Sequence, residues 1–96
     1  MRSLEESRAA LDAVDRELVR LFEQRMTIVR DVAAYKIAHG LPVLDRSREA
    51  QVLDSRADML TDPRLSGSVR VLFEQLMALS RAEQEALLSA AEEDSQ

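Results

Sequence analysis

The sequence lacks several residue types on which common kinds of functional site depend. It contains no cysteine and a single histidine, His39. Disulfide bonds, thiolate nucleophiles and zinc sites built from cysteine and histidine are therefore excluded. His39 stands beside Gly40 in a predicted loop, a position typical of a last-turn cation, so we assign it no catalytic role.

Aromatic residues, glycine and proline are also scarce. The 96 residues include one tyrosine, two phenylalanines, no tryptophan, two glycines and two prolines. Leucine, alanine, valine, glutamate and arginine fill most of the chain, and this composition is typical of a helical protein. Strand signals are almost absent, so we predict a single all-α domain.

Neither a basic excess nor a long apolar run is present. The formal net charge of -5 argues against nucleic acid or an anionic membrane surface as a partner. No apolar stretch is long enough to cross a bilayer, and the chain opens on acidic helix formers instead of a secretory signal. We therefore expect a cytoplasmic protein.

The few glycines and prolines divide the chain into three predicted helices. Ser3 and Glu6 have the spacing of a capping box for the first helix, which Gly40 ends. The predicted helices span roughly Leu4 to Ala38, Ser47 to Leu60, and from near Leu65 to Ser68 through to about Ala90. We expect one helical domain over residues 1–91 and a disordered acidic tail over residues 92–96.

Arg25 lies on the apolar stripe of the first helix, where a charge is unexpected. The equivalent heptad positions are Leu4, Leu11, Leu18 and Val32. Burial of an unpaired guanidinium costs several kcal/mol. We therefore expect an anion opposite Arg25, either a carboxylate of the protein or a ligand.

The first helix is too long for a compact domain of this size. About 35 residues extend about 50 Å, which two shorter helices cannot cover. We expect a second copy of the chain to cover the seam and form an intertwined homodimer.

Arg8 lies about 25 Å from Arg25 along the axis, so it would serve a different site. Lys36 lies about 16 Å from Arg25 on nearly the same face and can share its ligand.

Two further groups of polar residues accompany this stripe. Ser80 and Gln84 stand at i and i+4 on the packing face of the third helix, where they can face the same cavity as Arg25. The segment from Leu41 to Glu49 then delivers three charges to the start of the second helix, at Asp45, Arg48 and Glu49.

Each of these residues also has an ordinary structural interpretation. Asp45 is well placed as the N-cap of the second helix and Glu49 as a first-turn acid. Arg48 has the usual profile of a solvated surface arginine, and Lys36 that of a cation near a helix C-terminus. The pair on the third helix is equally consistent with a buried hydrogen bond between Ser80 and Gln84.

The polar residues, taken together, resemble the pattern of the all-helical chorismate mutases. The resemblance covers about Leu4 to Leu88 and is carried by residues at family spacing on all three helices. They are Arg8, Asp15, Arg25 and Lys36, then Asp45, Arg48 and Glu49 after Leu41-Pro42-Val43, and finally Ser80 and Gln84. The resemblance implies an intertwined homodimer with two sites, each completed by Arg8 of the other chain, and requires no metal or cofactor.

The resemblance also implies a role for each residue. Arg25 and the other chain's Arg8 would hold the substrate carboxylates, supported by Arg48 and Ser80. Asp45 and Glu49 would read the ring hydroxyl, directly or through backbone. Lys36 and Gln84 would donate hydrogen bonds to the ether oxygen, so the expected catalytic residues are Lys36, Gln84 and Arg25.

Three other functions remain open from the sequence. An isochorismate pyruvate lyase has a similar helical dimer, and the segment from Asp45 to Glu49 together with Gln84 favours the mutase over it. A mutase for 4-amino-4-deoxychorismate would bind a substrate whose ring carries an amine in place of the hydroxyl. Asp45 and Glu49 could accept a hydrogen bond from either group. The third is a non-enzymatic dimerisation module, in which Arg25 would pair with an acid such as Asp15 across the seam.

Overall fold

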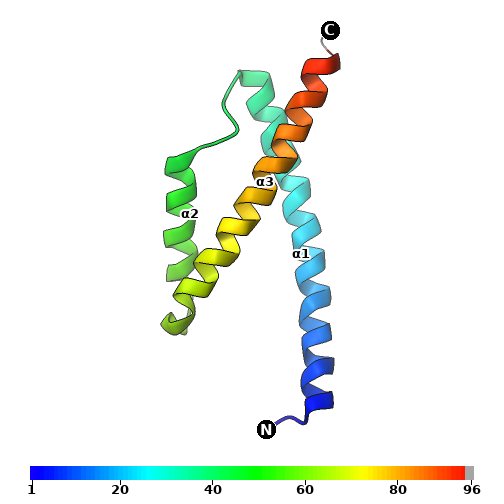
Figure 1. Cartoon of the computed structure of the whole chain (residues 1–96), viewed down its shortest axis with the longest axis vertical. Coiled ribbons are helices and arrows are strands. Elements are labelled where there is room, and N and C mark those ends of the chain that lie inside the picture. Colours follow the sequence, from blue (N-terminus) through cyan, green and yellow to red (C-terminus); the bar gives the residue numbers. More distant parts are fainter. Residues whose placement is uncertain (95–96) are drawn as a thin grey trace.

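A computed structural model describes residues 1–94, and it is all-helical as predicted. Figure 1 shows the three long helices: α1 spans Leu4–His39, α2 spans Arg46–Asp58 and α3 spans Ser66–Asp94, with a short 3-10 turn, η1, at Pro63–Leu65. No helix among residues 1–94 is long and apolar enough to cross a membrane.

The ends of α1 carry the predicted local signals. The Ser3 hydroxyl accepts a hydrogen bond from the Glu6 backbone N–H at 3.1 Å, and the Glu6 carboxylate accepts one from the Ser3 N–H, so the capping box is confirmed. Gly40 ends the helix in the left-handed conformation, with φ of 64°, which glycine adopts without the steric cost of a side chain.

The later boundaries differ slightly from those predicted. Asp45 caps α2, because its side chain accepts a hydrogen bond from the Arg48 N–H at 3.0 Å, and the helix ends at Asp58, two residues before Leu60. The third helix continues to Asp94, so Glu92 to Asp94 are helical and not part of the expected disordered tail. The remainder of that tail, Ser95 and Gln96, lies outside the described residues.

Helix α3 packs against both other helices and so organises the fold. Its first half lies beside α2 and its second half crosses α1 (Figure 1). Few side chains are buried, and the apolar ones are Val29 and Ala33 on α1, Val52 on α2 and Met77 on α3. This small core lies where the three helices meet, at the C-terminal half of α1.

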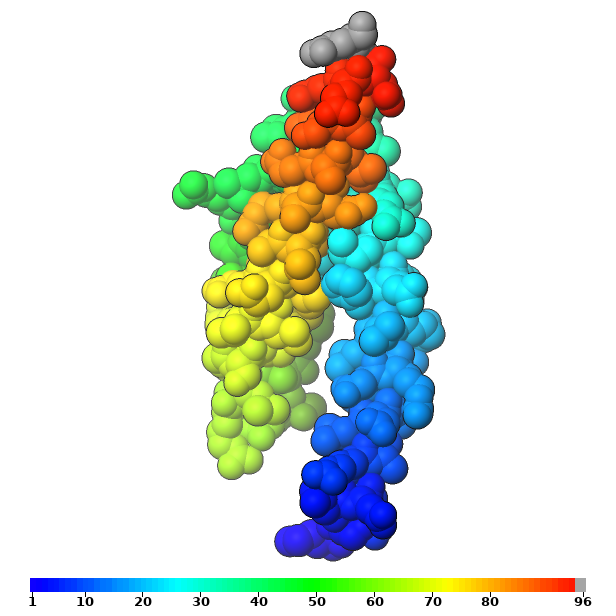
Figure 2. Space-filling view, turned by 45° about the vertical axis from the view of Figure 1, so that its right-hand side comes forward, coloured from blue at the N-terminus to red at the C-terminus, as the bar shows by residue number. Residues whose placement is uncertain are grey.

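The N-terminal half of α1 extends away from this core. Figure 2 shows it separated from the first half of α3, and the chain measures 60 × 26 × 14 Å overall. Large apolar side chains on this half are exposed, among them Leu11, Val14, Leu18 and Leu21. Residues 1–94 of one chain therefore leave the apolar seam of α1 uncovered.

Candidate functional site

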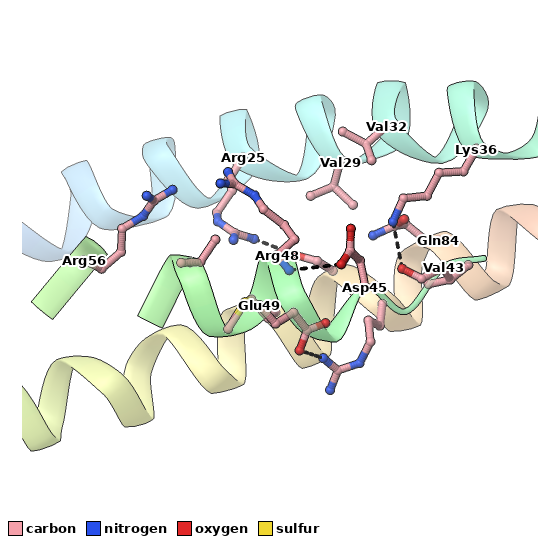
Figure 3. A pocket seen from close by; sticks show the side chains of 14 residues that line it. Arg25, Val29, Val32, Lys36, Val43, Asp45, Arg48, Glu49, Arg56 and Gln84 are labelled. Carbon is pink, nitrogen blue, oxygen red and sulfur yellow. Dashed lines mark hydrogen bonds and ion pairs between the residues drawn. The ribbon is translucent and has the colours of Figure 1, made fainter. Parts of the chain in front are cut away.

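One pocket lies beside the core and takes side chains from all three helices and from the loop before α2 (Figure 3). It is lined by Arg25, Val29, Val32 and Lys36 of α1, Val43 and Asp45 of the loop, Arg48, Glu49, Val52 and Arg56 of α2, and Met77, Ser80, Arg81 and Gln84 of α3. The structure thus brings together every site residue predicted from the sequence except Arg8.

Arg25 reaches across from α1 to α3 and is partly buried. Its guanidinium donates hydrogen bonds to the Ser80 hydroxyl and, at 3.5 Å, to the Leu76 carbonyl. No carboxylate within residues 1–94 forms an ion pair with Arg25, so these residues do not supply the protein carboxylate that was one of the two expected anions. Burial, and then the charge of Arg56, lower the pKa of the Arg25 guanidinium below its ordinary value.

Lys36 and Gln84 line the same end of the pocket (Figure 3). The Lys36 ammonium donates a hydrogen bond to the Val43 carbonyl at 2.7 Å, which ties the loop before α2 to α1. An ammonium has three N–H donors, so two remain available for a ligand. The Gln84 side chain is 7% exposed, and its Oε1 atom accepts no hydrogen bond from residues 1–94.

A buried polar atom without a hydrogen-bond partner calls for an explanation, and a ligand that donates to the Oε1 atom of Gln84 would supply one. The alternative of a Ser80–Gln84 hydrogen bond is wrong, because the Ser80 hydroxyl donates instead to the Leu76 carbonyl at 2.8 Å and accepts from Arg25. Ser80 is also 7% exposed. The serine therefore orients Arg25, while the glutamine is left free to contact a ligand.

Asp45 and Arg48 each form a hydrogen bond at the start of α2 and also line the pocket. Asp45 caps α2 with its Oδ1 atom and also lines the pocket, where Figure 3 shows its carboxylate directed toward α1. Arg48 is exposed, as an ordinary surface arginine would be, and donates a hydrogen bond to Gln51 at 3.0 Å. Both residues line the pocket, although Asp45 also caps α2 and Arg48 is exposed.

Glu49 forms an ion pair with Arg81 of α3 (Figure 3 marks the contact at Glu49). The pair joins the helix that carries Asp45 and Arg48 at its start to the helix that carries Ser80 and Gln84. In Figure 3 the Glu49 carboxylate is directed away from α1, in contrast to that of Asp45.

Two arginines of the pocket, Arg56 and Arg81, were missed by the sequence reasoning. Arg56 lies seven residues after Glu49 and four after Val52, so helical spacing places it on their face and could have indicated it. Its guanidinium lies 5.9 Å from the centre of the Phe73 ring. Arg81 had no comparable signal, because its contact with Glu49 depends on how α2 and α3 pair.

The lining is strongly cationic although the chain as a whole is acidic. Five cations and two carboxylates line the pocket, whereas the formal net charge of the chain is -5. Such a local excess favours an anionic ligand, and arginine side chains bind carboxylates through paired hydrogen bonds. The apolar side chains of Val29, Val32, Val52 and Met77 supply the contact surface for a carbon skeleton.

Arg8 is exposed on the N-terminal half of α1, outside this pocket. It precedes Arg25 by nearly five helical turns along one continuous helix, in agreement with the expected separation. Within one chain, Arg8 and Arg25 therefore belong to different places on the molecule.

Comparison with known proteins identifies a family for most of the chain. Residues 7–85 match the family model described as chorismate mutase type II. The chain is 39% identical over 56 residues to the T-protein of Haemophilus influenzae, covering 58% of this chain and 15% of that protein. It is 36% identical over 77 residues to a 3-dehydroquinate dehydratase of Pyrobaculum aerophilum, covering 80% of this chain and 22% of that protein. The chain thus spans less than a quarter of the length of either relative.

Proposed function

Because the chain belongs to the chorismate mutase type II family, we propose that it converts chorismate to prephenate. The reaction is an intramolecular [3,3] rearrangement in which a carbon–oxygen bond breaks while a carbon–carbon bond forms. It needs no nucleophile and no obligatory proton transfer. The protein's task is to hold a dicarboxylate in a compact, chair-like conformer and to stabilise the charge that develops on the ether oxygen.

The observation that carries this proposal is the composition of the pocket. A dicarboxylate requires several cations, and the lining has five, of which Arg25 is held by Ser80 and has no carboxylate partner within residues 1–94. Binding the substrate would satisfy a guanidinium that folding leaves uncompensated. The neutral Gln84 amide and the Lys36 ammonium stand together at one end, as two donors to a single oxygen would.

We assign roles to the residues on this basis. Arg25 and Arg48 bind carboxylates, with Ser80 orienting Arg25 and contributing to the same anion-binding shell. Asp45 and Glu49 accept from the ring hydroxyl. Lys36 and Gln84 donate to the ether oxygen, where negative charge grows as the bond breaks, so they bind the transition state better than the ground state.

The exposed seam of α1 supports an intertwined homodimer as the working form. A cleft between α1 and α3 is lined by Leu18, Val19, Leu21, Phe22, Arg25, Leu72, Phe73 and Leu76. Exposed apolar patches of this kind mark protein–protein contacts. A second copy of α1 placed there would cover the seam, and its Arg8 would complete the anion-binding shell around Arg25.

Incubation of the purified protein with chorismate tests the proposed activity. We expect loss of the cyclohexadiene absorbance far above the spontaneous rate, with prephenate identified as the product by NMR. A parallel incubation with isochorismate separates the mutase from a lyase, because a lyase would release pyruvate. Failure to accelerate chorismate rearrangement would overturn the proposal. A cytoplasmic location also belongs to this proposal, and cell fractionation tests it.

A further inference from the structure

The Arg81–Glu49 ion pair differs from the other ion pairs of residues 1–94 in its surroundings. Its side chains are 34% and 24% exposed, whereas every other pair has at least one side chain that is 58% exposed or more. It is also the ion pair whose two members both line the pocket. Partial burial reduces screening by solvent, so the charges of this pair act more strongly than those of a surface pair.

The pairing has two consequences for Glu49. It fixes the carboxylate between α2 and α3, and it offsets the negative charge that Glu49 would otherwise present to an anionic substrate. Arg81 donates a hydrogen bond to Oε1 of Glu49, and Oε2 accepts none from residues 1–94. Glu49 therefore retains an acceptor for a ligand donor while contributing little net charge.

The other charged groups that line the pocket with Glu49 come from all three helices. They are Arg25 and Lys36 of α1, Asp45 before α2, Arg48 and Arg56 of α2, and Arg81 of α3. Asp45 already uses one oxygen to cap α2. With Glu49 offset by Arg81, the remaining charges around the acceptor favour a donor that brings no positive charge of its own.

We propose that Arg81 is a specificity-determining residue, which makes this pocket prefer a ring hydroxyl over a protonated amine at the same position of the substrate. The inference rests on the proposed mutase function and narrows its substrate to the 4-hydroxy compound, chorismate. A hydroxyl donates one hydrogen bond to the free oxygen of Glu49 without adding charge. An aliphatic amine is protonated at neutral pH, so it would place a cation beside Arg81 and the other pocket cations.

Kinetics with two substrates tests this assignment. The ratio of kcat/KM for chorismate to that for 4-amino-4-deoxychorismate is measured for the wild-type protein, Arg81→Ala and Arg81→Lys. We expect the ratio to favour chorismate in the wild type and to fall by about tenfold or more in Arg81→Ala, because an unpaired Glu49 attracts the ammonium. Arg81→Lys retains the charge and should keep the ratio within about threefold of the wild type.

Arg30→Ala is the matched control. Arg30 pairs with Glu83 of α3 at 3.0 Å, so its removal also breaks an ion pair between helices, but neither residue lines the pocket. The Arg30→Ala ratio should equal that of the wild type. An Arg81→Ala variant that loses activity equally toward both substrates, or an Arg30→Ala variant that shifts the ratio as much, would assign Arg81 a purely structural role and overturn the inference.

Failure of the proposed function would be visible separately. If the wild-type protein accelerates neither substrate, the mutase proposal fails, and calorimetric binding of the same two compounds then tests Arg81 without turnover. If the wild-type protein binds chorismate more tightly than 4-amino-4-deoxychorismate, and Arg81→Ala loses this difference, the proposed selectivity would still be supported. Equal binding of both compounds by the wild type would contradict it.

Discussion

Arg25 of α1 donates a hydrogen bond to the hydroxyl of Ser80 on α3, and this contact joins the two helices at the pocket. The hydroxyl fixes the guanidinium but does not neutralise it. Ser80 in turn donates to the Leu76 carbonyl at 2.8 Å, so its own position is set by the backbone of α3. The chain thus holds a partly buried cation in a defined orientation.

Replacing Arg25 by methionine should stabilise the fold while removing activity. The pKa of Arg25 is lowered by burial, so the charge disfavours the folded state at every pH below that pKa, and the cost is relieved only as pH rises through it. Because Arg25 is only partly buried and solvent screens its charge, we expect the free energy of unfolding at pH 7 to rise by less than about 1 kcal/mol, measured by urea denaturation at fixed protein concentration. A less stable Arg25→Met protein would show that Arg25 is compensated in the native state.

Lys36→Ala should lose at least about a hundredfold in kcat while remaining folded, because loss of one donor to a developing oxyanion costs about 3 kcal/mol. Stopped-flow or steady-state kinetics with chorismate measures the change, and circular dichroism checks the helices. Arg46→Ala, which removes a nearby exposed cation that does not line the pocket, is the control and should keep near-normal kcat. Near-normal turnover by Lys36→Ala would refute its role.

Arg56→Ala should raise KM for chorismate by several-fold with little change in kcat, since a cation at the pocket edge binds ground state and transition state alike. Arg70→Ala is a suitable comparison, because Arg70 pairs with Asp54 at 3.0 Å between the same two helices outside the pocket. Unchanged KM in Arg56→Ala, or an equal rise in Arg70→Ala, would argue that Arg56 serves packing on Phe73 instead.

Mixed dimers should reveal whether Arg8 completes the other chain's site. Arg8→Ala and Arg25→Ala are each expected to be nearly inactive alone. After co-refolding of equal amounts, random pairing makes half of the dimers heterodimers, and each has one intact site, so about a quarter of wild-type activity should return. Recovery that never exceeds the sum of the two variants would mean that Arg8 and Arg25 do not serve a shared site.

Much of the fold follows from local signals in the sequence. The capping box at Ser3 and Glu6, the left-handed Gly40 and the cap at Asp45 each act within a few residues, so their effects on helix ends are readable directly. The third helix exceeded its predicted end, because the acidic residues after Ala90 favour helix as readily as coil and no glycine or proline stops them.

The site was predictable where its residues interrupt a periodic pattern. Arg25 stands out against an apolar stripe, and Ser80 and Gln84 stand out on a packing face. Arg81 does not stand out in the sequence, because arginine is common on helix surfaces and its role depends on which helix packs beside it. Its contact with Glu49 joins residues 32 positions apart, and spacing within one helix carries no information about such a pairing.

The structure of the protein bound to a bicyclic dicarboxylate that mimics the transition state would test the central claim most directly. We predict that the mimic occupies this pocket with its ether oxygen within hydrogen-bond distance of both Lys36 and Gln84, and with one carboxylate on Arg25. A mimic bound elsewhere, or bound in the pocket with its ether oxygen away from both donors, would contradict the proposed mechanism.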